Sequence, residues 1–207
     1  MREETVKKYL DKYSIGVVEI KNSLGQYNSF FKNMGFSEPI ETLIESRLKG
    51  KVFVRVLDIG CGNGGFLSGL KKMFGECVHT IGVDLLAPEK ESDQPVIGDA
   101  LEVEWPKEVD FIFSFRALHE IGEPEKIIKK AYGSLASGGK AFLSFRTLDL
   151  YSGEKGIGVI GAKEIKALQK MVRSRRLEGF SVNGFEVRVD GGNGKKLTAG
   201  VNVFLEK

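Results

Sequence analysis

An apolar segment followed by a glycine-rich turn constrains the fold of this 207-residue chain more than any other feature. Residues 52–59 are mostly apolar, which predicts a buried strand, and glycines then stand at every second position from Gly60 to Gly64. Glycines let the backbone pass close to a ligand, and a helix that follows directs unpaired N–H groups at it. The sequence therefore predicts a strand, a tight turn and a helix that together mark a nucleotide-like site. The expected core side of the helix carries Phe66, Leu67, Leu70, Met73 and Phe74.

The length and composition suit one α/β domain with a short appendage. Apolar residues make up 42% of the chain and charged residues 29%, and no apolar stretch is long enough to span a bilayer. The N-terminus is charged, so we expect a cytoplasmic protein without a membrane anchor. Two cysteines and two histidines are too few to predict a disulfide framework or a metal site.

The positions Gly60, Gly62 and Gly64, with Asp58 just before the turn, resemble motif I of the class I S-adenosylmethionine-dependent methyltransferases. The resemblance covers about residues 50–207 and implies a Rossmann-like fold with S-adenosyl-L-methionine as cofactor. A structural turn in another kind of α/β protein is the alternative. The cofactor-binding residues that the resemblance implies at this turn are Asp58, Gly60, Cys61, Gly62 and Asn63.

Two further acidic residues follow predicted strands. Asp84 ends the apolar segment 78–84 and lies 24 residues beyond Gly60, the distance at which a Rossmann-like unit places a carboxylate on ribose hydroxyls. Leu85 follows it directly. Residues 96–101 resemble the family's third motif, in which an Asp follows a short strand, and the resemblance implies that Asp99 and Ala100 hold the adenine. The short connection 85–95 is similar to that of ribosomal RNA ribose methyltransferases.

The predicted fourth strand, residues 109–115, ends where an open α/β sheet places its chemistry. Ser114 or the Phe115 backbone is expected to orient an acceptor amine, and Phe115 also to contact the cofactor. His119 is the candidate general base, with a packing role as the alternative, and Glu120 is the other candidate base. Arg116 and Arg146 suit a phosphate or carboxylate on the substrate.

Residues 1–50 predict a helical extension, and residues 51–207 the S-adenosylmethionine-binding domain. Two helical pieces flank a looser aromatic segment, residues 25–36. This segment is expected either to cover the sheet edge or to form a lid in which Tyr27 and Phe30 stack on a flat substrate.

The end of the chain predicts a basic helix and a closing hairpin. The helix, residues 162–176, carries Lys166, Lys170 and Arg173 on one side, which suits phosphate contact or simple solvation. Strands are expected over residues 180–189 and 197–205. The resemblance then implies a doubly wound sheet of seven strands in the order 3-2-1-4-5-7-6, with the seventh antiparallel.

These patterns predict methyl transfer by in-line displacement at a sulfonium methyl group. Ribosomal or transfer RNA is the first expected substrate, with a base amine favoured over ribose. The alternatives are N- or O-methylation of a small molecule, favoured by residues 114–121, and a non-catalytic subunit that binds cofactor and RNA. We expect a monomer or a small homo-oligomer.

Overall fold

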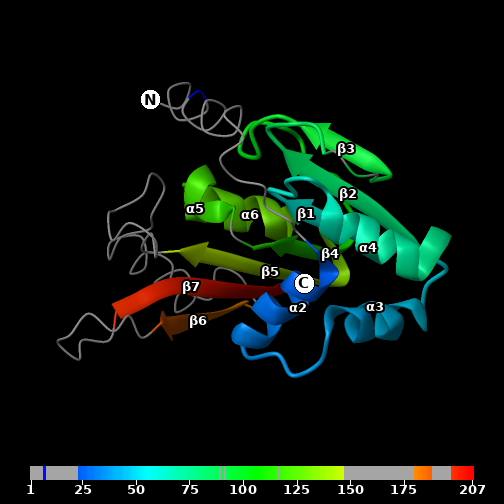
Figure 1. Ribbon diagram of the computed structural model, residues 1–207, viewed down its shortest axis with the longest axis horizontal. Coiled ribbons are helices and arrows are strands. Elements are labelled where there is room, and N and C mark those ends of the chain that lie inside the picture. Colours follow the sequence, from blue (N-terminus) through cyan, green and yellow to red (C-terminus); the bar gives the residue numbers. More distant parts are fainter. Residues whose placement is uncertain are drawn as a thin grey trace.

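A seven-stranded sheet crosses the molecule, with helices on both faces (Figure 1). The computed structural model describes residues 7, 23–88, 90, 92–115, 117–146, 180–187 and 197–207. The strands are β1 (Val54–Ile59), β2 (Val78–Asp84), β3 (Gln94–Ile97), β4 (Val109–Ser114), β5 (Leu135–Arg146), β6 (Phe180–Val187) and β7 (Leu197–Glu206).

The sheet order is β3-β2-β1-β4-β5-β7-β6, which is the order that the family resemblance implies. The pairs β1–β2, β2–β3, β1–β4 and β4–β5 are parallel, whereas β7 runs antiparallel to β5 and β6. The carboxyl ends of the parallel strands therefore meet at one edge of the sheet, which we call the carboxyl edge. The opposite edge is the amino edge.

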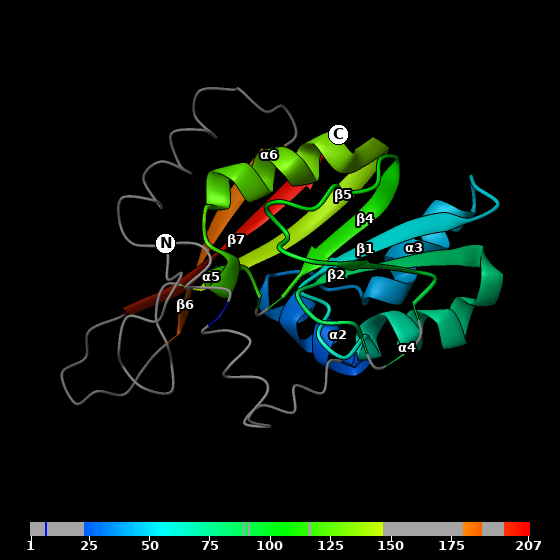
Figure 2. The same cartoon turned by 90° about the horizontal axis from the view of Figure 1, so that it is seen from above.

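Helices cover the two faces of the sheet unequally (Figure 2). On one face lie α2 (Leu24–Asn33), α3 (Ile40–Leu48) and α4 (Gly65–Phe74), which a 3₁₀ turn (Gly75–Cys77) follows, and the other face carries α6 (Pro124–Ser134). The short α5 (Leu118–Ile121) follows the end of β4. Each face buries its own apolar cluster, so β1 and β4 are covered on both sides.

The aromatic segment that the sequence predicts to be loose is a helix. Ser23 caps α2 by accepting a hydrogen bond from the Gln26 backbone, while the Gln26 side chain accepts one from the Ser23 backbone. This reciprocal capping satisfies two N–H groups that a helix start leaves unpaired. Tyr27 and Phe31 are buried, so α2 is held down by core packing.

Two local predictions about the core are wrong. β1 begins at Val54, and Val52 outside it is 90% exposed. Met73 is 55% exposed because it lies on the outer side of α4. β3 ends at Ile97, and Asp99 and Ala100 follow in the next turn, which agrees with the expected Asp after a short strand.

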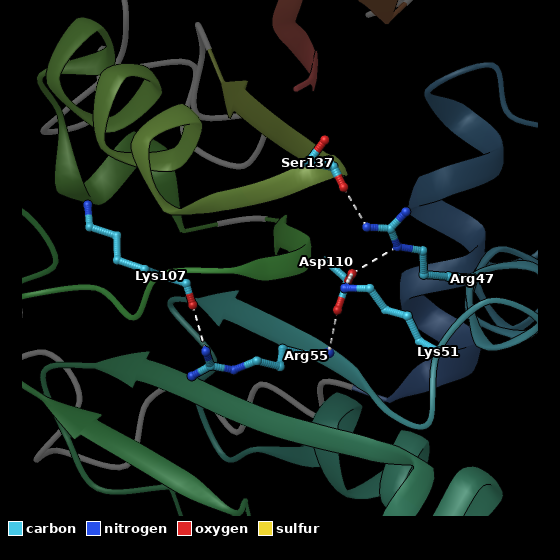
Figure 3. Close-up of polar contacts among 6 residues, drawn as sticks. All are labelled: Arg47, Lys51, Arg55, Lys107, Asp110 and Ser137. Atoms are coloured by element: carbon cyan, nitrogen blue, oxygen red, sulfur yellow. Dashed lines mark hydrogen bonds and ion pairs between the residues drawn. The ribbon is translucent and has the colours of Figure 1, made fainter.

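A cluster of charged residues fastens α3 to the amino edge (Figure 3). The carboxylate of Asp110, in β4, accepts hydrogen bonds from Arg47 Nε at 2.8 Å, Lys51 Nζ at 2.6 Å and the Arg55 backbone at 3.0 Å. Arg47 also donates to the carbonyl of Ser137. Burial raises the pKa of Asp110, but its bonds with Lys51, Arg55 and Arg47 outweigh burial and hold that pKa below its usual value.

The closing strands β6 and β7 agree with the predicted segments to within a few residues. Three other predictions lie outside the described residues, so the structure does not test them. They are the first helical piece of the extension, the basic helix 162–176 with Lys166, Lys170 and Arg173, and the hairpin turn 190–194.

Candidate functional site

The glycine turn lies at the carboxyl edge between β1 and α4. Gly60, Gly62 and Gly64 all have positive φ, at 73°, 55° and 74°. The backbone N–H of Gly60 donates to the carbonyl of Val83 at 2.7 Å, which ties the turn to β2. A Cβ on Gly60 would lie 2.1 Å from the Cβ of Ala117, so the turn also fits closely against the loop after β4.

Asp84 ends β2 beside this turn. Its carboxylate accepts hydrogen bonds from the backbone of Gly62 at 2.8 Å and of Leu86 at 3.2 Å, and the residue is 8% exposed. Burial raises the pKa of Asp84, while backbone N–H groups of Gly62, Leu86 and Leu85 oppose the rise. The structure thus joins the glycine turn and Asp84 directly, as the spacing of 24 residues requires.

Asp58 is the fully buried acid of the site. Both of its carboxylate oxygens accept a hydrogen bond from the hydroxyl of Tyr27, at 3.0 and 2.9 Å. Burial is the main cause that raises the pKa of Asp58 to about 8; the Tyr27 bond lowers it, and the negative charge of Asp84 raises it. Burial and Asp58 likewise raise the pKa of Tyr27 well above its usual value.

Of the two expected roles for the aromatic segment, the buried position of Tyr27 agrees with covering the sheet and differs from the exposed lid position. Its ring lies stacked on Phe66 with centroids 4.0 Å apart, and it also packs against Phe115 at 5.0 Å. Stacking of a substrate on Tyr27 would require this ring to leave the core. Phe30 is only partly buried and lies 6.0 Å from Phe115, so its expected role in substrate binding stays a prediction.

The turn after β3 holds Asp99 and Ala100. Asp99 accepts a hydrogen bond from the Leu101 backbone at 2.9 Å. The carbonyl of Ala100 accepts from Trp105 Nε1 and from Lys130 Nζ, both at 2.9 Å. These bonds fix the turn at the carboxyl edge, and the expected contact of both residues with adenine stays a prediction.

The predicted acceptor residues are only partly described. Ser114 is fully buried, and its hydroxyl donates to the carbonyl of Ile59 at 2.7 Å, so this hydroxyl joins β4 to β1. Phe115 is 2% exposed and packs against α2. Arg116 lies outside the described residues. His119 belongs to α5 and Arg146 ends β5, but their side chains are not among those described.

Cys61 and Asn63 contribute to the shape of the turn. The thiol of Cys61 is buried against β2, where a Cβ on Gly82 would lie 2.8 Å from the sulfur. Burial raises the pKa of this thiol, which keeps it neutral and unsuited to nucleophilic attack. The side chain of Asn63 accepts a hydrogen bond from the Gly65 backbone at 3.0 Å and so shapes the start of α4.

Sequence reasoning missed a polar pair on the α2 face of the sheet. Asn202 of β7 pairs in register with Ser144 of β5, near the carboxyl edge. Asn202 is 6% exposed, and its side-chain oxygen has no hydrogen-bond partner among the described residues. A polar residue between Val201 and Val203 is the only sequence signal, and it does not reveal which strand lies opposite.

The polar groups at the carboxyl edge fit S-adenosylmethionine. This cofactor carries an ammonium group, a ribose with two hydroxyls and an adenine. The carboxylates of Asp58, Asp84 and Asp99 follow one another across β1, β2 and the end of β3, and the glycine turn supplies a close backbone approach. Carboxylates accept hydrogen bonds from hydroxyl, amino and ammonium groups, so the chemistry of the three parts matches.

Comparison with known proteins gives the same class. The family model described as a methyltransferase domain matches residues 29–185, so the chain belongs to this family. Its fold is that of the class I S-adenosylmethionine-dependent methyltransferases, as the sequence resemblance implies. S-adenosylmethionine is the cofactor of that class.

Individual relatives are more distant. The ubiquinone biosynthesis O-methyltransferase of Pseudomonas putida (strain W619) is 29% identical over 156 residues, which are 65% of this chain and 65% of that protein. An arsenic(III) S-adenosylmethionine methyltransferase from Chlamydomonas reinhardtii has a TM-score of 0.53 at 18% identity, covering 75% of this chain and 64% of its own. The DszA carbon methyltransferase also has a TM-score of 0.53, at 15% identity. The match covers 82% of this chain and 52% of that protein. These two structures show the shared fold.

Within the described part of the chain, no group of three or more His, Cys, Asp or Glu side chains is placed to hold a metal ion. The same residues include no helix with the length and apolarity to cross a membrane.

Proposed function

We propose that this chain transfers a methyl group from S-adenosylmethionine to a nitrogen or oxygen of a small molecule. The observation that carries the proposal is the distribution of charge between the two edges of the sheet. Asp58, Asp84 and Asp99 lie at the carboxyl edge, whereas Arg47, Lys51 and Arg55 lie at the amino edge (Figure 3). The carboxylates of Asp84 and Asp99 beside the cofactor site disfavour a phosphate backbone there but accept hydrogen bonds from the polar groups of a metabolite, for which Arg146 at the end of β5 is an available cation.

The surroundings of the acceptor position also suit a small molecule. The partly buried ring of Phe30, which packs on Phe115, supplies aromatic surface, and the buried amide oxygen of Asn202 near the same edge has no hydrogen-bond donor among the described residues. Leaving a buried acceptor without a partner costs about 1–3 kcal/mol, so a hydroxyl or amine of the substrate would be stabilised there. The similarity to an O-methyltransferase of ubiquinone biosynthesis supports the same class of acceptor.

The residues that would hold the cofactor are Asp84 for the ribose, Asp99 and Ala100 for the adenine, and Asp58 with the glycine turn for the amino-acid part. Bound S-adenosylmethionine would supply a methyl group already activated by its sulfonium centre. The protein then has to orient the acceptor atom in line with that methyl group. It also has to receive the proton that the acceptor atom loses. His119 stays the predicted base for an oxygen acceptor.

RNA is the second candidate. The feature of the sequence that favours it most, the basic helix with Lys166, Lys170 and Arg173, lies outside the described residues. The cytoplasmic location and the state of assembly likewise stay predictions.

Transfer of labelled methyl from S-adenosylmethionine distinguishes the two candidates. The purified chain is offered total RNA and a small-metabolite extract at two salt concentrations. We expect label in the metabolite fraction at both salt concentrations, because a small acceptor does not release a counterion atmosphere as RNA does. Label confined to RNA and weakened by salt would contradict the proposal.

Matched variants test whether the described site carries the transfer. Asp84→Ala removes the carboxylate beside Gly62, so we expect loss of label from the metabolite fraction. Glu45→Gln removes a carboxylate from the exposed side of α3 and should leave transfer unchanged. Equal activity of the two variants would place the cofactor away from Asp84.

A further inference from the structure

The hydrogen bond between Tyr27 and Asp58 lies beneath the glycine turn and joins α2 to β1. Both side chains are fully buried, and the two Tyr27–Asp58 distances of 3.0 and 2.9 Å place the phenol between the carboxylate oxygens. Tyr27 is itself held by stacking on Phe66 and by packing against Phe115. The phenol therefore fixes the orientation of the Asp58 carboxyl group.

Asp58 has no cationic partner among the described residues. The titratable groups that face it are Tyr27 from α2, Cys61 from the glycine turn and Asp84 from the end of β2. The phenol and the thiol are neutral, and the Asp84 carboxylate is negative. Burying a carboxylate without a positive partner raises the free energy of the folded protein. Such a group is stabilised either by binding a proton or by pairing with a cation.

The cofactor brings such a cation, because its amino-acid part ends in an ammonium group. We propose that Asp58 carries a proton before the cofactor binds, that the cofactor's ammonium group displaces this proton to solvent, and that Tyr27 is the positioning residue for the exchange. The carboxylic acid loses its proton, the carboxylate then pairs with the ammonium group, and the cofactor's own bonds stay intact. The exchange does not depend on the identity of the methyl acceptor.

The pH dependence follows from the same contacts. The pKa of Asp58, raised to about 8 mainly by burial, makes the carboxyl group protonated at neutral pH in the protein without cofactor. Loss of the Tyr27 bond would raise the pKa of Asp58 further, because this bond stabilises the charged form. Tyr27→Phe keeps the ring that stacks on Phe66 and removes only the hydroxyl.

Calorimetric titration with S-adenosylhomocysteine tests the exchange without catalysis. Binding heats measured in two buffers of different ionisation enthalpy give the number of protons released per ligand, from about pH 6 to about pH 8.5. We expect the wild-type chain to release about one proton near pH 7 and fewer as the pH approaches the pKa of Asp58. Asp58→Asn should bind without this release.

Two tyrosine variants separate positioning from packing. Tyr27→Phe should still release a proton, but the decline in release should move to higher pH and the affinity near pH 7 should fall. Tyr132→Phe, which removes a phenol on the other face of the sheet, should behave as the wild-type chain does. A purely structural role of Tyr27 would change affinity without moving the pH of release.

Binding of S-adenosylhomocysteine without proton release by the wild-type chain would overturn the proposal. Release of as many protons per ligand by Asp58→Asn as by the wild-type chain would also overturn it. Failure of the wild-type chain to bind the ligand at all would overturn it together with the assignment of the cofactor site. Transfer to RNA in place of a metabolite would leave it standing.

Discussion

Gly60 lies where the turn after β1 meets the loop after β4, and the space beside it is already filled. A Cβ at this position would lie 2.1 Å from the Cβ of Ala117, and the backbone has a φ of 73°. Both the conformation and the contact therefore exclude a side chain.

Gly60→Ala should destabilise the protein strongly. The unfavourable φ costs about 1–3 kcal/mol for a residue with a side chain, and overpacking against Ala117 adds about 1–3 kcal/mol. The measurement is the free energy of unfolding in urea, with S-adenosylhomocysteine affinity as a second readout.

Two variants separate these contributions to the cost of Gly60→Ala. Gly35→Ala also adds a side chain at positive φ, 96°, but nothing lies within 4 Å of its Cβ, so only the conformational cost should appear. Adding Ala117→Gly to Gly60→Ala should restore the part of the free energy of unfolding that the contact with Ala117 removes. No recovery in the double variant would show that the close approach to Ala117 does not limit this turn.

At the scale of the elements, the charged cluster at the amino edge holds α3 against β1, β4 and β5. Asp110 is 2% exposed and receives bonds from Arg47, Lys51 and the Arg55 backbone, so its charge matters to several elements at once. Arg47 and Lys51 are partly exposed, and water can still solvate them when Asp110 is changed.

Asp110→Asn should lower the free energy of unfolding at neutral pH by about 1–3 kcal/mol, because charged hydrogen bonds are lost while an acceptor for Arg55 remains. Since the pKa of Asp110 is lower in the folded state, its contribution is present above about pH 4 and is lost as the pH falls through the folded value. The variant should therefore lose less stability on acidification than the wild-type chain.

Asp93, whose pKa is also lowered, keeps part of the acid sensitivity in that variant. The control is Glu206→Gln, which removes a partly exposed carboxylate 3.7 Å from Lys140 and should cost less than about 1 kcal/mol. If the free energy of unfolding falls equally with pH in Asp110→Asn and in the wild-type chain, the cluster does not stabilise the fold through charge.

For the whole molecule, local patterns predicted the sheet well because each parallel strand carries its own apolar segment and turn. Spacing placed the glycine turn and Asp84, and alternation of apolar residues placed the closing strands, while the strand order came from the family resemblance. The same patterns could not give contacts that depend on which elements lie opposite each other. Tyr27 and Asp58 are 31 residues apart, and no local signal joins them.

Residues at element ends were hardest to place from the sequence. Val52 is apolar but precedes the strand, and Met73 follows the helical spacing but lies on the solvent side of the last turn of α4. The segment around Tyr27 contains Gly25, Asn28 and Asn33, residues that disfavour helix, yet capping by Ser23 and burial of two aromatic rings override them.

A crystal structure of the chain with S-adenosylhomocysteine tests the central claim most directly. The account predicts ribose hydroxyls on Asp84, the ammonium group beside Asp58 and the adenine at the turn of Asp99 and Ala100. The amino-acid part should pass along Gly60 and Gly62, with its sulfur directed toward the end of β4. Ligand bound elsewhere, with Asp84 facing only the protein backbone, would contradict the assignment of this carboxyl edge as the site of methyl transfer.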